Sequence, residues 1–466
     1  MEFLLLVAGI CGLIWGVWFM LRGSLVAGCM AVILVGSTFG YWFWHSEGGL
    51  PLTVDRAFLV LLFVSYAFRR QFGATEPKPI MRADWALFAL LAVLTLSTFT
   101  HDWKFEKGEP LAHLVIYWLV PGSIYWIARQ SQLNERTIRG VFVAFALFGV
   151  YLTITALTEA AGQWSLVFPE YIASPTHQYF GRARGPFLNP VALGIYLTTA
   201  VMSALMLWPR LGRIGQLLLL LFSAIASAAF LATLTRSVWL GGALSGVIFL
   251  ALILPGQWRV LLVGAGSAVL LVTFVMKADS FLNIKRDEKL DAAASAESVE
   301  LRPILANVAW NMFLDQPLFG FGFGQYDRER LPYLADRSSE LPLEKSRPYV
   351  QHNTFLALLT DTGLAGTGLF VLLLVLWISN AWALWNNHSA SLPLRQIGLV
   401  FMVIMGIYMA NAMFHDTSII DGVNILVFFL AGLISGLTSQ IRNFTSAEDP
   451  TVIPDRRCRY SLSGAA

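Results

Sequence analysis

The stretch HNTFLALLTDTGLAGTGLFVLLLVLW, residues 352–377, decides the class of the fold. It opens with a histidine and an asparagine, and it carries no charged residue after Asp361. The apolar part continues to residue 385, and a membrane-spanning helix needs about 20 such residues. The stretch therefore predicts a spanning helix with a titratable ring where the chain enters the membrane. Gly363 and Gly366 would let another helix approach closely, although packing alone also explains such a pair.

The composition extends this prediction to the whole chain. Of the 466 residues, 56% are hydrophobic and 13% are charged, whereas a soluble globular protein carries about 25% charged residues. Apolar blocks of spanning length recur along the chain, so we expect an all-α polytopic membrane protein with about 12–14 transmembrane helices. The predicted spans are residues 3–21, 24–44, 52–68, 85–100, 111–128, 139–158, 190–208, 215–234, 237–254, 259–276, 363–385, 397–414 and 423–439.

Net charge and cysteine usage exclude several classes of protein. The formal net charge is only +3, so no nucleic-acid partner is indicated. The three cysteines have no spacing that is typical of a metal site or a disulfide framework. The first apolar block has no basic segment before it, so we interpret it as a first span and not as a cleavable signal peptide.

Lysine and arginine are unevenly distributed between alternate loops, and short basic loops stay in the cytoplasm. The opposite loops, which include the long segment 277–351, are then predicted on the outer side, the periplasm of a Gram-negative cell. The basic loops contain Arg69, Arg70, Lys78, Arg82, Arg129, Arg136, Arg139, Arg210, Arg213, Arg259 and Arg395. The predicted regions are N-terminal spans (1–180), central spans with outer arginines (181–276), a large periplasmic loop (277–351), C-terminal spans (352–439) and a disordered cytoplasmic tail (440–466).

The second part of the long outer segment has a clear helical pattern. Its apolar residues recur at the spacing of one helix face, which predicts an amphipathic helix that Arg302 starts. The helix should stop near Asp315, because Pro317 disfavours helix in the residue before it. Three glycines then allow sharp turns or a close approach of the backbone. The helical residues are Ile304, Leu305, Val308, Ala309, Met312 and Phe313, and the glycines are Gly320, Gly322 and Gly324.

One histidine and four arginines are predicted to meet on the outer side, near the membrane surface. An arginine beside apolar spans is costly without a partner, and its planar fork fits phosphate oxygens. The alternative is that these arginines reach lipid headgroups and that the histidine only borders a helix. The residues alone leave both interpretations open. The five residues are His352, Arg182, Arg184, Arg236 and Arg302.

The sequence lacks the motifs that are typical of several kinds of site. No HExxH pattern or Cys/His cluster is present, so we expect no metal site, and no P-loop or Rossmann glycine pattern suggests a cofactor. Two weak candidates are the HDW segment at 101–103, for a metal, and the outer pair His415 and Asp416. Acidic residues within spans are scarce, with Asp361 the main doubtful case, which argues against an ion-coupled transporter.

Four segments carry a resemblance to a known family. The segment HNTFLALLTDTGLAG (352–366) has a His-Asn pair, nine residues and then Gly-x-x-Gly, and TRSVWLG (235–241) precedes it in the chain. Between them lies LRPILANVAWNMFLDQPLFGFGFGQY (301–326), and RGPFLNPVALG (184–194) comes earlier. In combination these segments resemble the O-antigen ligase and polymerase superfamily of bacterial envelope enzymes. The first 180 residues match it only as hydrophobic helices.

The resemblance implies a GT-C-like membrane glycosyltransferase of the inner membrane, with its active site facing the periplasm. Such enzymes transfer a glycan from undecaprenyl diphosphate to lipid A–core or another glycan acceptor, with inversion and without a metal or other cofactor. By motif, the essential histidine falls on His352 and the two essential arginines on Arg236 and Arg302, and Arg184 is a further residue for diphosphate binding. The arginines would stabilise the leaving group, and a neutral His352 would take the acceptor proton.

Three functions stay open at this point. A ligase would transfer a finished glycan, whereas a polymerase would lengthen a lipid-linked chain by the same chemistry. A membrane transporter is the alternative from another class, and it would be expected to show paired repeats with broken helices. No such repeat is apparent in the sequence.

Overall fold

The computed structural model describes residues 23–44, 53–75, 77–276, 292–335, 339 and 341–448. Over these residues the chain forms helices and no strand, which confirms the predicted all-α class. By length and composition, nine helices in this part of the chain can cross a membrane, so the protein is a polytopic membrane protein. The predicted span 3–21 lies outside the described residues, and the total number of spans stays a prediction.

The nine candidate spans coincide with predicted apolar blocks. They are α5 (Arg82–Phe99), the run of α6 (Pro110–Leu114), η1 (Val115–Leu119) and α7 (Val120–Gln130), α8 (Glu135–Ala160), α9 (Pro190–Met206) with η5 (Trp208–Arg210), α10 (Arg213–Leu231), α11 (Arg236–Ile253), α17 (Thr354–Asn386), α18 (Leu392–Ala412) and α19 (Val423–Glu448). The remaining helices of the apolar blocks are α2 (Leu25–Phe39), α3 (Tyr41–Trp44), α4 (Val54–Gln71) and α12 (Gly256–Met276). Since α19 continues to Glu448, it extends beyond the predicted start of the tail at residue 440.

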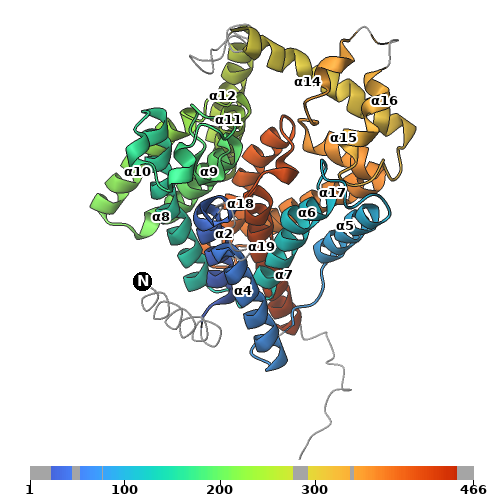
Figure 1. The fold of residues 1–466 in the computed structure, drawn as a ribbon. Helices are drawn as coiled ribbons and strands as arrows, with labels where there is room; N and C mark the ends of the chain where they lie inside the picture. Colours follow the sequence, from blue (N-terminus) through green and yellow to red (C-terminus); the bar gives the residue numbers. More distant parts are fainter. Residues whose placement is uncertain are drawn as a thin grey trace, which may run out of the picture.

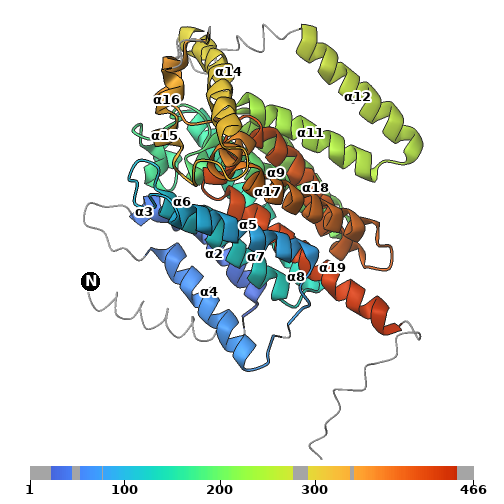
Figure 2. The same ribbon diagram turned by 90° about the vertical axis from the view of Figure 1, so that its right-hand side faces the viewer.

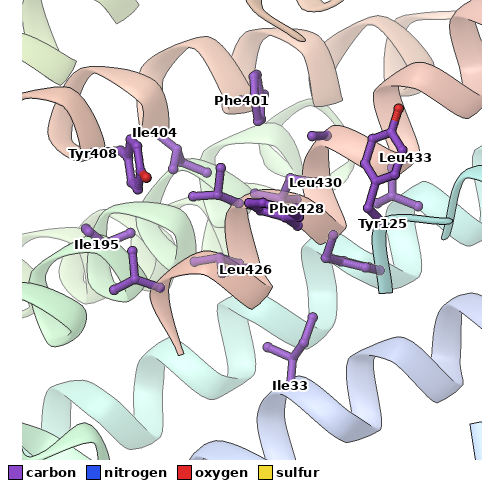
Figure 3. Close-up of a cluster of buried hydrophobic side chains, with 14 of the residues drawn as sticks. Ile33, Tyr125, Ile195, Phe401, Ile404, Tyr408, Leu426, Phe428, Leu430 and Leu433 are labelled. Carbon is purple, nitrogen blue, oxygen red and sulfur yellow. The ribbon is translucent and has the colours of Figure 1, made fainter. Parts of the chain in front are cut away.

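Helix α19 lies at the centre of the bundle (Figure 1), packed against α7, α17, α18 and α2. Figure 3 shows Phe428 of α19 in the middle of this contact, with Phe401 of α18 on one side and Ile33 of α2 on the other. Lipid tails are as apolar as leucine, so helices in a membrane associate through close packing. A Cβ atom at Gly432 of α19 would lie 2.5 Å from the carbonyl oxygen of Tyr125 in α7, so only glycine permits this approach.

A buried ion pair joins α5 and α7 at the end of the bundle that the basic loops predict to be cytoplasmic. Arg129 Nε lies 2.7 Å from Asp84 Oδ1, and both side chains are fully buried. The Tyr125 hydroxyl donates a 2.7 Å hydrogen bond to the same carboxylate oxygen, and Arg129 also donates to the Pro79 carbonyl. Arg129 was assigned to a basic loop, but here its charge stabilises the contact between two spans.

The long outer segment forms a small unit with its own core at the opposite end of the bundle from the C-terminal end of α19 (Figures 1 and 2). Its helix α14 (Ala292–Asp315) ends at the predicted residue but begins ten residues earlier than expected, so Arg302 lies inside the helix. The unit continues with α15 (Tyr326–Glu329), α16 (Leu331–Leu334) and η6 (Leu343–Ser346). Its core consists of Ile304, Val308, Met312, Tyr326, Leu334 and Leu343.

Candidate functional site

The start of α17 is fixed to the loop between α18 and α19. Asn353 caps the helix, because its Oδ1 accepts hydrogen bonds from the Phe355 and Leu356 N–H groups at 2.9 and 3.0 Å. Its amide nitrogen donates to the Met413 carbonyl at 3.1 Å. The Thr354 hydroxyl donates to the His415 carbonyl at 3.1 Å. The segment that carries His352 is therefore held against residues 413–415.

His352 comes next to a second histidine from this loop. The two imidazole rings of His352 and His415 are arranged edge to face, with their centroids 6.4 Å apart. A 3.0 Å hydrogen bond joins His415 Nε2 to Ser237 Oγ. Ser237 follows Arg236, the first residue of α11. The beginnings of α11 and α17 and the end of α18 thus meet around two imidazole rings.

Arg302 of α14 completes the cluster. Its guanidinium carbon lies 5.1 Å from the centroid of the Phe414 ring, which is a cation–π contact. Burial lowers the pKa of Arg302, and the positive charge of Arg236 lowers it further. Among the residues that the structure describes, no carboxylate lies within ion-pair distance of Arg302. Two like charges in a half-buried position favour the binding of an anion.

The surroundings of His352 favour its neutral form. Burial lowers the pKa of the imidazole, and the positive charge of Arg302 lowers it further. A neutral imidazole can accept a proton, as a general base must. The structure therefore brings together three of the predicted site residues, His352, Arg236 and Arg302, and the pKa of His352 is lowered, which is the direction that the predicted role requires.

Arg184, the fourth predicted site residue, is fully buried and makes internal contacts. Each of its terminal nitrogens donates to two carbonyl oxygens, and its Nε lies 3.7 Å from Glu159 Oε1. The carbonyls belong to Ile172, Ser174, His177 and Gln178, at 2.7 to 2.9 Å. These bonds use the donors that a diphosphate would need, so they indicate that Arg184 holds the loop 172–178 in place. A role in diphosphate binding stays a prediction.

The weaker candidate residues lie in different parts of the structure and have other partners. His101 Nδ1 lies 2.8 Å from the Ser97 carbonyl oxygen, and Asp102 pairs with Arg328 at 3.7 Å. Asp416 accepts hydrogen bonds from the N–H and hydroxyl groups of Ser418, so it caps the short helix η7 (Thr417–Ile419). In the described part of the chain, no three His, Cys, Asp or Glu residues are placed to hold a metal ion.

Sequence reasoning missed one residue of the site, Phe414, and ranked another, His415, only as a weak candidate. Phe414 packs on Arg302, and His415 packs on His352. Phe414 ends the predicted span 397–414 and His415 directly follows it on the outer side, which could have indicated them. Their partners, Arg302 of α14 and His352 just before α17, are distant in sequence.

A comparison with protein families agrees with this geometry. A family model described as O-antigen ligase matches residues 217–371. The matched segment contains Arg236, Arg302 and His352, whereas Arg184 and His415 lie outside it. No curated protein shows significant similarity to the chain. The match confirms the resemblance drawn from the motifs, and the segment that supplies both arginines and the histidine of the site is similar to the O-antigen ligase family.

Proposed function

We propose that this protein is a membrane glycosyltransferase that moves a glycan from undecaprenyl diphosphate to an acceptor hydroxyl, as in O-antigen ligation to lipid A–core. The observation that carries the proposal is the meeting of His352, Arg236 and Arg302 at one end of the spanning helices. A polyprenyl diphosphate would fit this arrangement. Its lipid tail lies in the bilayer, and its diphosphate lies at the membrane surface, where the three side chains meet.

In this proposal Arg302 and Arg236 bind the diphosphate. A guanidinium presents parallel N–H donors that match phosphate oxygens. The mutual repulsion of the two arginines is relieved when an anion lies between them. As the bond to the sugar breaks, negative charge grows on the diphosphate, and fixed positive groups in a partly buried site stabilise that charge. The arginines therefore supply the positive charge for which other enzymes use a metal ion, and the reaction is metal-independent.

His352 acts on the other side of the sugar. It takes the proton of the acceptor hydroxyl while the acceptor oxygen forms a bond to the anomeric carbon. The bond between that carbon and the diphosphate oxygen breaks, and undecaprenyl diphosphate leaves with the electron pair. A single displacement of this kind inverts the anomeric carbon. The edge-to-face contact with His415, which Ser237 holds in turn, orients the His352 ring for this step.

We place the site on the periplasmic face of the inner membrane. The support is the charge of the loops, because the basic loops alternate with those that carry the site. A glycan polymerase would use the same three residues with a lipid-linked repeat unit as the acceptor. The ligase and the polymerase therefore differ in the acceptor and not in the chemistry.

The experiment uses purified protein with a lipid-diphosphate-linked glycan and two acceptors in parallel, lipid A–core and a second lipid-linked repeat unit. Transfer to lipid A–core supports the ligase, and transfer to the repeat unit supports the polymerase. His352→Ala should lower the rate by about 10²- to 10⁴-fold. His388→Ala is the matched control, because His388 is exposed in the loop between α17 and α18 at the other end of the bundle. Unchanged transfer by His352→Ala would overturn the proposal.

A further inference from the structure

Helix α17 is interrupted at Gly363, where φ is 60° and ψ is −155°. This conformation is open almost only to glycine. In an uninterrupted helix, the N–H groups of Leu364 and Ala365 would donate to the carbonyls of Thr360 and Asp361. The break removes both bonds and leaves all four backbone groups in need of other partners.

The segment directly after α14 supplies these partners. Each of the four groups forms one hydrogen bond of 2.8 to 3.1 Å to residues 317–322. Leu364 N donates to Pro317 O, Ala365 N to Leu318 O, Phe321 N to Thr360 O and Gly322 N to Asp361 O. Four bonds between segments thus replace two bonds within a helix. We call this contact, formed by residues 317–322 and 360–365, the backbone lock.

The backbone lock leaves no room for a side chain at its two central glycines. A Cβ atom at Gly363 would lie 2.5 Å from the carbonyl carbon of Leu318, and one at Gly320 would lie 2.6 Å from the Thr360 carbonyl oxygen. A loop, and not another helix, therefore makes the close approach that Gly363 allows. The Asp361 side chain adds a further bond, because its Oδ2 accepts from the Gly324 N–H at 3.0 Å.

The lock joins the two elements that carry the reacting groups. Arg302 lies on α14, about 20 Å before the end of that helix, and α17 runs about 14 Å from its start to Gly363. The two helices are in contact, so the way in which the lock joins them sets the position of Arg302 relative to His352.

A side-chain bond connects the lock to the base more directly. The Gln351 side-chain nitrogen donates to the Thr360 hydroxyl at 3.1 Å, and both side chains are buried. Gln351 immediately precedes His352, and the carbonyl of Thr360 is one of the acceptors in the lock. The position of the imidazole is therefore linked to the lock by one buried hydrogen bond.

We propose that the backbone lock holds His352 against Arg302, and that Gly363, Gly320 and Thr360 are positioning residues for glycan transfer. This inference rests on the proposed function. A displacement of about 1 Å at a reacting group can lower a rate by about 100-fold, so a contact at the far end of both helices can control the reaction without touching the substrate.

The first test compares Gly363→Ala with Gly368→Ala. Gly368 lies in the same helix, and a Cβ there would meet no atom within 4 Å, so this control should match the wild type. Gly363→Ala should lower kcat at least about tenfold. The acid limb of its pH profile should also move to higher pH, because withdrawal of the Arg302 charge raises the pKa of His352. A defect of folding alone would not move that limb.

The groups that face His352 are Arg302 from α14 and His415 from the loop after α18, with Arg236 and Asp416 next to them. Of these groups, only Arg302 lies on the helix that leads directly into the lock, α14. The Gly363→Ala profile should therefore approach that of Arg302→Gln. A wild-type kcat and pH profile in folded Gly363→Ala would overturn the proposal.

A second pair of variants decides the question if Gly363→Ala does not fold. Thr360→Val removes the hydroxyl that Gln351 binds and keeps the shape, whereas Thr360→Ser keeps the hydroxyl. We expect a several-fold lower kcat and a raised acid limb in Thr360→Val, with both restored in Thr360→Ser. Equal kcat and pH profiles in both variants would overturn the lock, while full transfer by His352→Ala would overturn the proposed function as well.

Discussion

Replacing Arg302 with lysine separates the clamping of a phosphate from a general need for positive charge. Lysine keeps the charge but loses the planar fork of donors. The Arg302 guanidinium stacks 5.1 Å from the Phe414 ring centroid and has no carboxylate partner in the described part of the chain, which leaves its donors for an anion. Each charge-assisted contact that is lost should cost about 1.5–3 kcal/mol, or about ten- to a hundredfold in rate. Arg302→Lys should therefore be nearly as inactive as Arg302→Ala.

The assay is glycan transfer in cells that lack the native gene, normalised to the amount of protein in the membrane. Arg236→Lys should show the same loss, because Arg236 is the other arginine of the site. The control is Arg210→Lys, since Arg210 is half exposed and lies 3.8 Å from Glu135, and surface pairs contribute about 0–1 kcal/mol. Full transfer by both Arg302→Lys and Arg236→Lys would refute the diphosphate clamp.

Four further predictions concern pH, stability, topology and metal. The lowered pKa of His352 should preserve transfer under mildly acidic conditions. Arg302→Gln should move the acid limb of the kcat profile to higher pH, and an unmoved limb would show that the charge of Arg302 does not act on the pKa of His352. Arg129→Met should leave a buried carboxylate unpaired and destabilise the fold by about 3–5 kcal/mol, seen as a lower Tm in detergent, and an unchanged Tm would contradict the role of the ion pair. A reporter that is active only outside the cytoplasm should be active when fused after Asp291 and silent after Asn134, and the reverse would place the site on the wrong side. Transfer by the purified protein should persist in EDTA, whereas loss that Mg²⁺ or Mn²⁺ restores would show a metal requirement.

Hydropathy and motif spacing predicted much of the local structure. The described apolar blocks became helices, since the length and composition of a spanning helix are properties of one continuous segment. The end of α14 was also predictable, because Pro317 restricts its neighbour. The order of the motifs indicated Arg236, Arg302 and His352, and the structure places these three residues together.

Only the tertiary structure decided which segments distant in sequence contact one another. The sequence showed Gly363 as a small residue in a helix, but its broken backbone is possible only because residues 317–322 provide hydrogen bonds to it. Arg184 resembled the other outer arginines until its four carbonyl partners were visible. Helix formation depends on neighbours in the chain, whereas the partner of a buried polar group depends on which helices pack together. The order of residues in this sequence does not by itself show which helices those are.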